Sequence, residues 1–239
     1  KSFITSRGCP YPCTYCFNHV FEKIYSGKGK RIRRHSVDYV LNEILEVKKK
    51  YPLGCIKFYD DIFVSSVDEW FQEFVRRYKK EVNLPFNCQT RANLVTEDMV
   101  KLLKEAGCYS ACMSIEAGNP DLRNKLLRRN MSNEEITKAF DLFYKYGINT
   151  FTNSILGLPY STVENDIESV DLSLRCRVSF GEFPIFHPYP KTELGNFCVE
   201  KGLFDANYDN LHMSYQNISP LNCFTERQKG IQKNISELG

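Results

Sequence analysis

The sequence at residues 6–16 reads S-R-G-C-P-Y-P-C-T-Y-C and places Cys9, Cys13 and Cys16 in the spacing C-x-x-x-C-x-x-C. Structural zinc sites use four ligands, usually in two separated pairs, and no second pair of this kind follows in the chain. Disulfides would leave one of the three thiols over. An iron–sulfur cluster fits better, because thiolates suit its soft iron and three of them leave one iron open for chemistry.

The composition of the 239-residue chain narrows its class. Lys plus Arg is 32 and Asp plus Glu is 29, a formal charge of +3 that is too balanced for a dedicated nucleic-acid binder. Hydrophobic residues make up 42%, enough for a real core, and no apolar run approaches the roughly 18 residues of a membrane helix. The seven cysteines outside the cluster motif are scattered and predict core filling: Cys55, Cys88, Cys108, Cys112, Cys176, Cys198 and Cys223.

Short apolar stretches alternate with helical patterns along the chain. Six strands are expected, at residues 2–6, 54–59, 84–89, 109–115, 150–156 and 178–186. Strand–helix alternation favours a parallel sheet with covering helices. Six units of roughly 35 residues fit an open, six-unit (β/α)6 barrel better than the eightfold barrel, which takes about 250 residues. We expect a core barrel at residues 1–190 and a C-terminal extension at residues 191–239.

Helix ends are marked by capping residues. Ser36 is the expected N-cap of one helix, and another follows Thr96 and ends at Gly107. Two further helices are expected to begin at capping boxes, one at residues 132–135 and one at residues 161–164.

Polar residues follow several predicted strands at the point where each strand ends. They are the cysteine motif, Asp60 with Asp61, Arg91, Glu116 and the H-P-Y-P run at residues 187–190. In barrels of parallel strands, active residues gather at these carboxyl ends. The polar positions are therefore where a barrel enzyme would place its site.

The motif C-x-x-x-C-x-aromatic-C after a short strand resembles the signature of the radical S-adenosylmethionine (SAM) enzymes. The resemblance implies a [4Fe-4S] cluster on Cys9, Cys13 and Cys16, with SAM at the open iron. It implies reductive cleavage of SAM to a deoxyadenosyl radical, an electron donor of the flavodoxin or ferredoxin type, and an oxygen-labile enzyme of the cytoplasm.

The same resemblance assigns SAM contacts to residues that have simpler explanations. Tyr15 and Phe17 would pack on adenine, or are ordinary core aromatics. One of the two carboxylates of Asp60 and Asp61 would accept a hydrogen bond from the methionine ammonium group. The simpler explanation is an aspartate at the start of a helix. Arg91 would bind the methionine carboxylate, or forms a structural salt bridge.

Two later motifs complete the resemblance. Glu116, in the run S-I-E-A-G, is similar to the family's acidic residue on the ribose hydroxyls. Ile155, Gly157 and Leu158 resemble the segment that flanks adenine through its backbone, although Gly157 also suits a plain strand end. The glutamate usual a few residues later corresponds to Thr162 or Glu164 here, so no catalytic role is assigned to it.

The runs D-D-I-F, S-I-E-A-G and H-P-Y-P-K-T are similar to the branch whose members usually carry an N-terminal cobalamin-binding domain, which would precede residue 1. This implies methylation or rearrangement of an unreactive centre in a small molecule or natural product. Two alternatives stay open: a radical SAM enzyme without cobalamin, and a zinc-stabilised binding module without catalysis. Polar residues that could contact the substrate lie in the C-terminal extension, at Tyr208, His212 and Tyr215.

Overall fold

The computed structural model describes residues 1–211 and 214–238, so the predicted substrate residue His212 lies outside the described residues. Six strands are hydrogen-bonded in the order β1-β4-β5-β6-β7-β8, which is also their order along the chain. They are β1 (Ser2–Phe3), β4 (Ile56–Phe58), β5 (Phe86–Gln89), β6 (Cys108–Cys112), β7 (Asn149–Asn153) and β8 (Phe180–Glu182). The pairs from β1 to β7 are parallel. The predicted α/β class is confirmed, and the sheet is consistent with a partial, six-unit radical SAM barrel.

The chain divides into two compact units that interleave in sequence. Unit 1 consists of Lys1–Pro10, Lys30–Met113 and Glu135–Phe151, and unit 2 consists of Tyr11–Gly29, Ser114–Glu134 and Thr152–Gly239. The expected boundary between a core at residues 1–190 and an extension at residues 191–239 stays a prediction.

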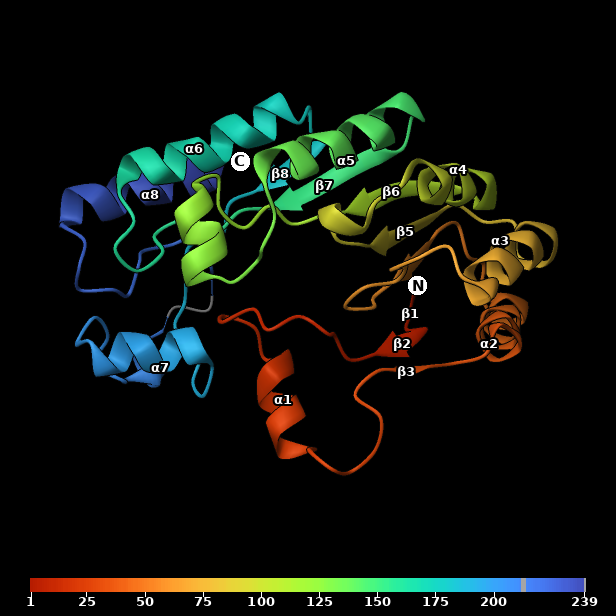
Figure 1. Ribbon diagram of the computed structural model, residues 1–239, viewed down its shortest axis with the longest axis horizontal. Coiled ribbons are helices and arrows are strands. Elements are labelled where there is room, and N and C mark those ends of the chain that lie inside the picture. Colours follow the sequence, from red (N-terminus) through yellow and green to blue (C-terminus); the bar gives the residue numbers. More distant parts are fainter. Residues whose placement is uncertain (212–213, 239) are drawn as a thin grey trace. The chain divides into compact units, whose positions relative to one another are not determined.

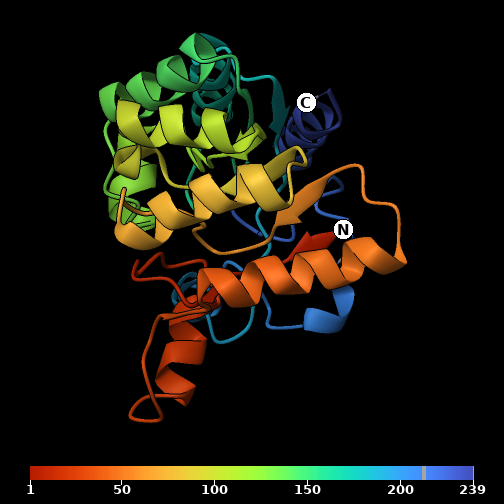
Figure 2. The same cartoon turned by 90° about the vertical axis from the view of Figure 1, so that its right-hand side faces the viewer.

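The starts of α2 and α4 and the end of α4 lie where the capping residues predict. Ser36 Oγ accepts a hydrogen bond from the amide of Tyr39 at the start of α2 (Val37–Lys50), and Thr96 Oγ1 accepts from Met99 at the start of α4 (Glu97–Ala106). Gly107 ends α4 with φ 95°, a conformation that glycine adopts without strain. In Figure 2, α2 lies beside α3 (Glu69–Glu81), and α3 lies beside α4. The fourth helix is α5 (Asn133–Lys145).

An aromatic cluster fills the core of unit 1. Phe58, Phe63 and Phe86 have no exposed surface, and they pack with Phe74 and Tyr78 of α3. Ring centroids lie 4.6 Å apart for Phe58 and Phe63, and 5.5 Å apart for Phe58 and Phe74. Burying each such ring stabilises the fold by roughly 2 kcal/mol. The cluster therefore fixes α3 on the strands that carry the predicted site residues at their ends.

Unit 2 contains α1 (Asn18–Ile24), α6 (Val163–Arg175), α7 (Glu193–Glu200) and α8 (Glu226–Leu238), together with a π-helical turn at Leu122–Leu126. The helix α8 lies alongside α6 in Figure 1. The capping box of α6 is one residue later than predicted, because Thr162 and Asn165 exchange the two bonds instead of Ser161 and Glu164. Short 3-10 turns occur at Ala92–Leu94 and Tyr208–Asn210.

The first predicted strand, residues 2–6, is interrupted after Phe3. The carboxylate of Asp60 accepts hydrogen bonds from the amides of Thr5 and Ser6 and from both hydroxyls, which removes these amides from a strand ladder. The chain then forms β2 (Ser6–Arg7), which pairs antiparallel with β3 (Arg33–Arg34). The sequence analysis did not predict this small second sheet.

No helix in the described part of the chain is long and apolar enough to cross a membrane.

Candidate functional site

The cysteine motif passes from one unit into the other: Cys9 belongs to unit 1, whereas Cys13 and Cys16 belong to unit 2. Cys13 is buried, the other two are partly exposed, and no disulfide joins any of the ten cysteines, all of which lie within the described residues. Three thiols of this kind fit a [4Fe-4S] cluster, because soft thiolates are the ligands such clusters take.

Among residues 1–211 and 214–238, no three His, Cys, Asp or Glu side chains converge as the ligands of a single metal ion. The thiolates of a four-iron cluster each bind a different iron atom, so they need not converge on one point. The assignment of the three cysteines to one cluster therefore rests on their spacing and on their chemistry.

Thr14 fixes the second half of the motif inside unit 2. Its Oγ1 donates to the carbonyl of Leu126 at 2.7 Å, and its amide donates to the carbonyl of Leu127 at 3.3 Å. Its own carbonyl accepts from the amide of Leu194 at 2.9 Å. The backbone between Cys13 and Cys16 is therefore held by three hydrogen bonds to two distant segments.

Arg129 is a buried cation beside the motif that the sequence analysis missed. Its Nη1 lies 4.0 Å from Cys13 Sγ, and its Nη2 donates to the carbonyl of Ser114 at 2.7 Å. Burial alone would lower the pKa of Arg129, but its electrostatic interactions with Tyr15, Glu116 and Cys13 outweigh burial and raise the pKa above its usual value. Arg129 therefore stays protonated next to a proposed cluster ligand.

Tyr15 and Glu116 meet in the same part of unit 2. The Tyr15 hydroxyl donates to Glu116 Oε1 at 2.8 Å. Burial raises the pKa of Tyr15 well above its ordinary value, and the charge of Glu116 adds to the rise, so the hydroxyl keeps its proton. A carboxylate has about four acceptor positions, so the bond from Tyr15 leaves Glu116 able to accept further donors.

The backbone around Glu116 requires a specific conformation. Glu116 has φ 68°, in the left-handed region. Its amide donates to the carbonyl of Asn153, and its carbonyl accepts from the amide of Ile155. Two residues later, a Cβ on Gly118 would come 2.2 Å from the carbonyl oxygen of Glu168 in α6. The glycine of the S-I-E-A-G run is therefore needed for close packing, which helps to hold the carboxylate of Glu116 in place.

The G-L-P segment is anchored by a buried carboxyl group. Gly157, at φ 63°, donates its amide to Asp166 Oδ1 at 3.0 Å, and Gln232 Nε2 donates to Asp166 Oδ2 at 3.1 Å. Leu158 is buried in the apolar core of unit 2, whereas Ile155 is only partly buried. Of these three residues, Ile155 is the one with an accessible side chain.

Phe17 lies at the start of α1, and its side chain is 37% exposed. Its ring packs against Tyr189 with a centroid distance of 5.3 Å. The structure therefore places Phe17 against a residue of the H-P-Y-P run.

The remaining predicted site residues belong to unit 1. Asp60 is buried and its carboxylate already binds Thr5 and Ser6, which gives it a structural role at the entry to the cysteine motif. Asp61 is exposed. Arg91 is buried, and its Nε donates to Asn93 Oδ1 at 2.8 Å.

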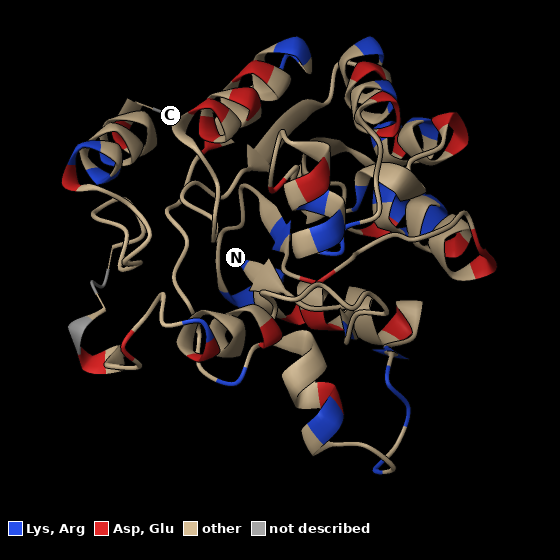
Figure 3. Ribbon diagram, turned by 60° about the vertical axis from the view of Figure 1, so that its left-hand side comes forward, with Lys and Arg blue, Asp and Glu red and all other residues tan. Residues whose placement is uncertain are grey.

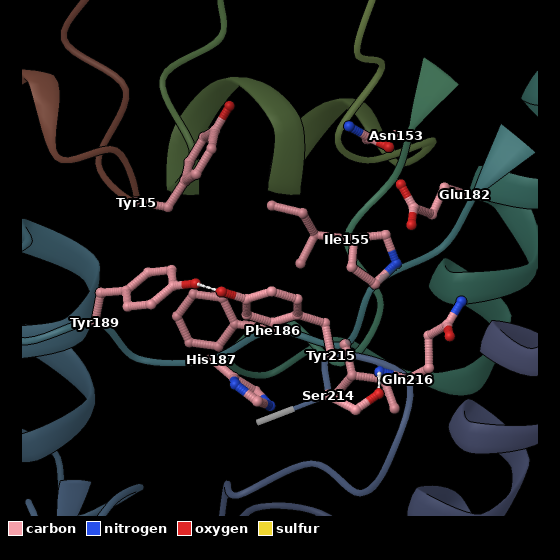
Figure 4. Close-up of a pocket in the computed structure, with 12 residues that line it drawn as sticks. Tyr15, Asn153, Ile155, Glu182, Phe186, His187, Tyr189, Ser214, Tyr215 and Gln216 are labelled. Atoms are coloured by element: carbon pink, nitrogen blue, oxygen red, sulfur yellow. Dashed lines mark hydrogen bonds between the residues drawn. The ribbon is translucent and has the colours of Figure 1, made fainter. Parts of the chain in front are cut away.

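A cavity of about 510 Å³ opens within unit 2 at the ends of β7 and β8. Figure 4 shows Tyr15, Ile155, Tyr189 and Tyr215 among the side chains that surround it. The predicted substrate residue Tyr215 thus lines the cavity, whereas Tyr208 packs on Phe204. The volume of the cavity is in the range of binding sites for small molecules.

The family model described as "Radical SAM superfamily" matches residues 3–172, which include the cysteine motif, Glu116 and the G-L-P segment. The chain belongs to the radical SAM superfamily. It is therefore a radical SAM enzyme by family, and the family implies a [4Fe-4S] cluster and SAM as cofactors.

Two curated relatives of this radical SAM chain carry methyltransferase names, and a third is an anaerobic magnesium-protoporphyrin IX monomethyl ester cyclase of Rubrivivax gelatinosus, 23% identical over 79% of the chain and 33% of that protein. An uncharacterized methyltransferase of Pyrococcus horikoshii is 24% identical over 94% of the chain and 48% of that protein. Cytidylyl-2-hydroxyethylphosphonate methyltransferase of Streptomyces wedmorensis is 26% identical over 89% of the chain and 40% of that protein. The chain thus spans half or less of the length of these relatives.

Among solved structures, the radical SAM methyltransferase TsrM of Kitasatospora setae, with cobalamin and a [4Fe-4S] cluster bound, superposes with a TM-score of 0.69. It is 21% identical, and the match covers 84% of this chain and 39% of TsrM. At this identity the likeness concerns the fold of the radical SAM core.

Replacing Arg129 by Met should lower the free energy of unfolding of the metal-free protein by about 3 kcal/mol, because Glu116 then stays buried without its cation. Adding Glu116→Gln should recover part of that loss. Urea denaturation at pH 7 measures both. Arg128→Met is the control, since Arg128 forms an exposed ion pair with Glu193 and should cost less than about 1 kcal/mol. Equal losses for the two arginines would contradict the role given to Arg129.

Asp166 should make stability depend on pH. Burial raises the pKa of Asp166 to about 6, against about 4 in the unfolded chain, so its contribution to stability falls as pH rises through that window. Asp166→Asn keeps the shape and removes the charge. Its gain in unfolding free energy over the unmodified protein should grow by about 2 kcal/mol between pH 4.5 and pH 8, measured by urea denaturation. A gain that does not change with pH would show that Asp166 is not held in this way.

Proposed function

We propose that this chain is the radical SAM core of a cobalamin-dependent enzyme that methylates or rearranges an unreactive centre of a small molecule. The observation that carries the enzymatic part is the three-cysteine motif with Cys13 beside the buried Arg129, next to Glu116. The methyltransferase names of two relatives and the cobalamin bound to TsrM support the proposed cobalamin-dependent reaction. Oxygen-labile cluster chemistry favours the cytoplasm, which cell fractionation would check.

The proposal assigns a role to several of the predicted site residues. Cys9, Cys13 and Cys16 hold the cluster, which when bound supplies one electron for the cleavage of a carbon–sulfur bond of SAM. Glu116 accepts hydrogen bonds from ribose hydroxyls at the acceptor positions that Tyr15 leaves open.

The methionine end of SAM carries an ammonium and a carboxylate group. We assign Arg91 to the carboxylate and Asp61 to the ammonium, since Asp60 is committed to Thr5 and Ser6. Cobalamin is expected from a part of the protein outside residues 1–239, which the greater length of the relatives supports.

The full protein should bind a cluster and consume SAM after anaerobic reconstitution with iron, sulfide, cobalamin and a reductant. We expect a brown protein, S-adenosylhomocysteine and 5′-deoxyadenosine. Cys13→Ala should lose the cluster, while Cys55→Ala, an exposed cysteine outside the motif, should keep it.

The products separate the alternatives for the reaction. Formation of 5′-deoxyadenosine without S-adenosylhomocysteine would remove methyl transfer and favour a radical SAM enzyme without cobalamin. A colourless protein that binds zinc would contradict the enzymatic proposal altogether.

We also propose a docking surface for an acidic electron donor of the flavodoxin or ferredoxin type. Arg7 of β2 lies directly opposite Arg33 of β3, and both are exposed. Like charges opposite each other in an antiparallel pair destabilise it, and an external anionic partner would relieve this repulsion. Arg31 Nε donates to the carbonyl of Cys9 at 3.1 Å, which joins this basic surface to the cluster motif. Figure 3 shows the segment before β3 in the blue of Lys and Arg.

Arg33→Glu should slow reduction of the cluster by reduced flavodoxin at least about fivefold at low ionic strength, because charge complementarity sets the rate of encounter. Reduction by dithionite should not change. Arg76→Glu on the exposed face of α3 is the matched control. If both variants slow the reaction to the same extent, general charge and not this surface is responsible.

A further inference from the structure

The cavity of unit 2 combines apolar walls with several polar side chains, which are Asn153, Glu182, His187, Ser214 and Gln216. Its walls are formed by aliphatic, aromatic and proline side chains, among them Ile155, Pro184 and Phe186. In Figure 4 the polar side chains of Asn153 and Glu182 lie next to each other at one end of this space. Among the described residues that line the cavity there is no Lys or Arg, and His187 is a histidine in the lining. The described lining therefore offers no permanently cationic side chain for an anionic ligand.

Asn153 and Glu182 come together because they end neighbouring strands. Asn153 is the last residue of β7 and Glu182 the last of β8, and the amide of Ser154 donates to the carbonyl of Glu182 at 3.0 Å. Neighbouring parallel strands end at the same edge of a sheet, so their last residues lie side by side. The position of both acceptors is therefore set by the sheet.

Both side chains have acceptor atoms without a protein donor. Asn153 Oδ1 is buried and has no hydrogen-bond partner in the part of the chain that the structure describes. Within the same residues, Glu182 takes part in no ion pair and no side-chain hydrogen bond. A buried acceptor without a donor, such as Asn153 Oδ1, costs about 1–3 kcal/mol. Glu182 is partly exposed, and its carboxylate has no counter-charge among the described residues. A ligand with two donors and a positive charge would satisfy the acceptor of Asn153 and balance the charge of Glu182.

We propose that this cavity binds a substrate with an apolar, aromatic-sized body and a protonated nitrogen, and that Glu182 and Asn153 bind the nitrogen. The proposal rests on the proposed function, since it names the substrate class of that radical SAM enzyme. Tyr15 and Ile155, assigned to SAM, line the same cavity, so the substrate body lies next to SAM. The carbonyl of Tyr215 accepts from the amide of Ile185 at 2.6 Å, and the Tyr215 hydroxyl contacts that of Tyr189. The C-terminal extension, through Tyr215, thus forms part of the cavity wall.

The test uses two indole probes of similar size and opposite charge, tryptamine and indole-3-propionate. Equilibrium dialysis against the anaerobically reconstituted enzyme, saturated with SAM and without reductant, measures binding without turnover. We expect tryptamine to bind at least about tenfold more tightly than indole-3-propionate. Glu182→Gln should weaken tryptamine about tenfold and leave indole-3-propionate unchanged, while Asn153→Asp should strengthen tryptamine, because it adds a second carboxylate. Opposite shifts in the two variants cannot both come from misfolding.

Glu200→Gln, an exposed change on α7, is the control and should not alter either affinity. Equal binding of the two probes, binding of neither at millimolar concentration, or loss of tryptamine binding when SAM is added would each overturn the proposal. The last result would show that the acceptors belong to the SAM site. Because the assay needs no cleavage of SAM, an enzyme that binds tryptamine as expected but forms no product would refute the proposed function and leave the cationic site standing.

Discussion

The buried guanidinium of Arg129 is the interaction on which the rest of the site in unit 2 depends. It reaches Cys13 Sγ at 4.0 Å, binds the carbonyl of Ser114 at 2.7 Å, and supplies positive charge to Glu116. Without it, a carboxylate and a proposed cluster thiolate would share a buried region with no counter-charge, which is costly in an apolar interior. One cation therefore makes two negative groups compatible with burial.

That constraint explains how the segment before Arg129 is built. Leu126 and Leu127 accept hydrogen bonds from Thr14, so the segment that carries Arg129 also fixes the cysteine motif. Arg123, fully buried, holds the same segment by donating to the carbonyls of Ala117 and Met131. The second half of the motif is thereby joined to residues more than 100 positions away in the sequence.

The sequence predicted what local patterns encode. Ser36, Thr96 and Gly107 mark helix ends through bonds within four residues, and strands predicted at residues 54–59 and 84–89 contain β4 and β5. Long-range features were missed, because no short pattern distinguishes a buried arginine such as Arg129 from its exposed neighbour Arg128. For the same reason the local pattern extended the first strand through residue 6, although Asp60, distant in sequence, takes the amides that would continue it.

Glu116 and Glu182 show how two carboxylates in one unit are prepared for different ligands. Glu116 has Arg129 nearby and a hydrogen bond from Tyr15, so its charge is already balanced and a neutral donor such as a ribose hydroxyl completes it. Glu182 has neither a cation nor a side-chain hydrogen bond among the described residues, so its charge remains to be balanced. Because Glu182 is partly exposed and lacks a counter-charge, whereas Glu116 is buried beside Arg129, the first position suits a neutral ligand and the second favours a cation. The distribution of protein charge around each acid, and not the acid itself, thus sets which kind of ligand it favours.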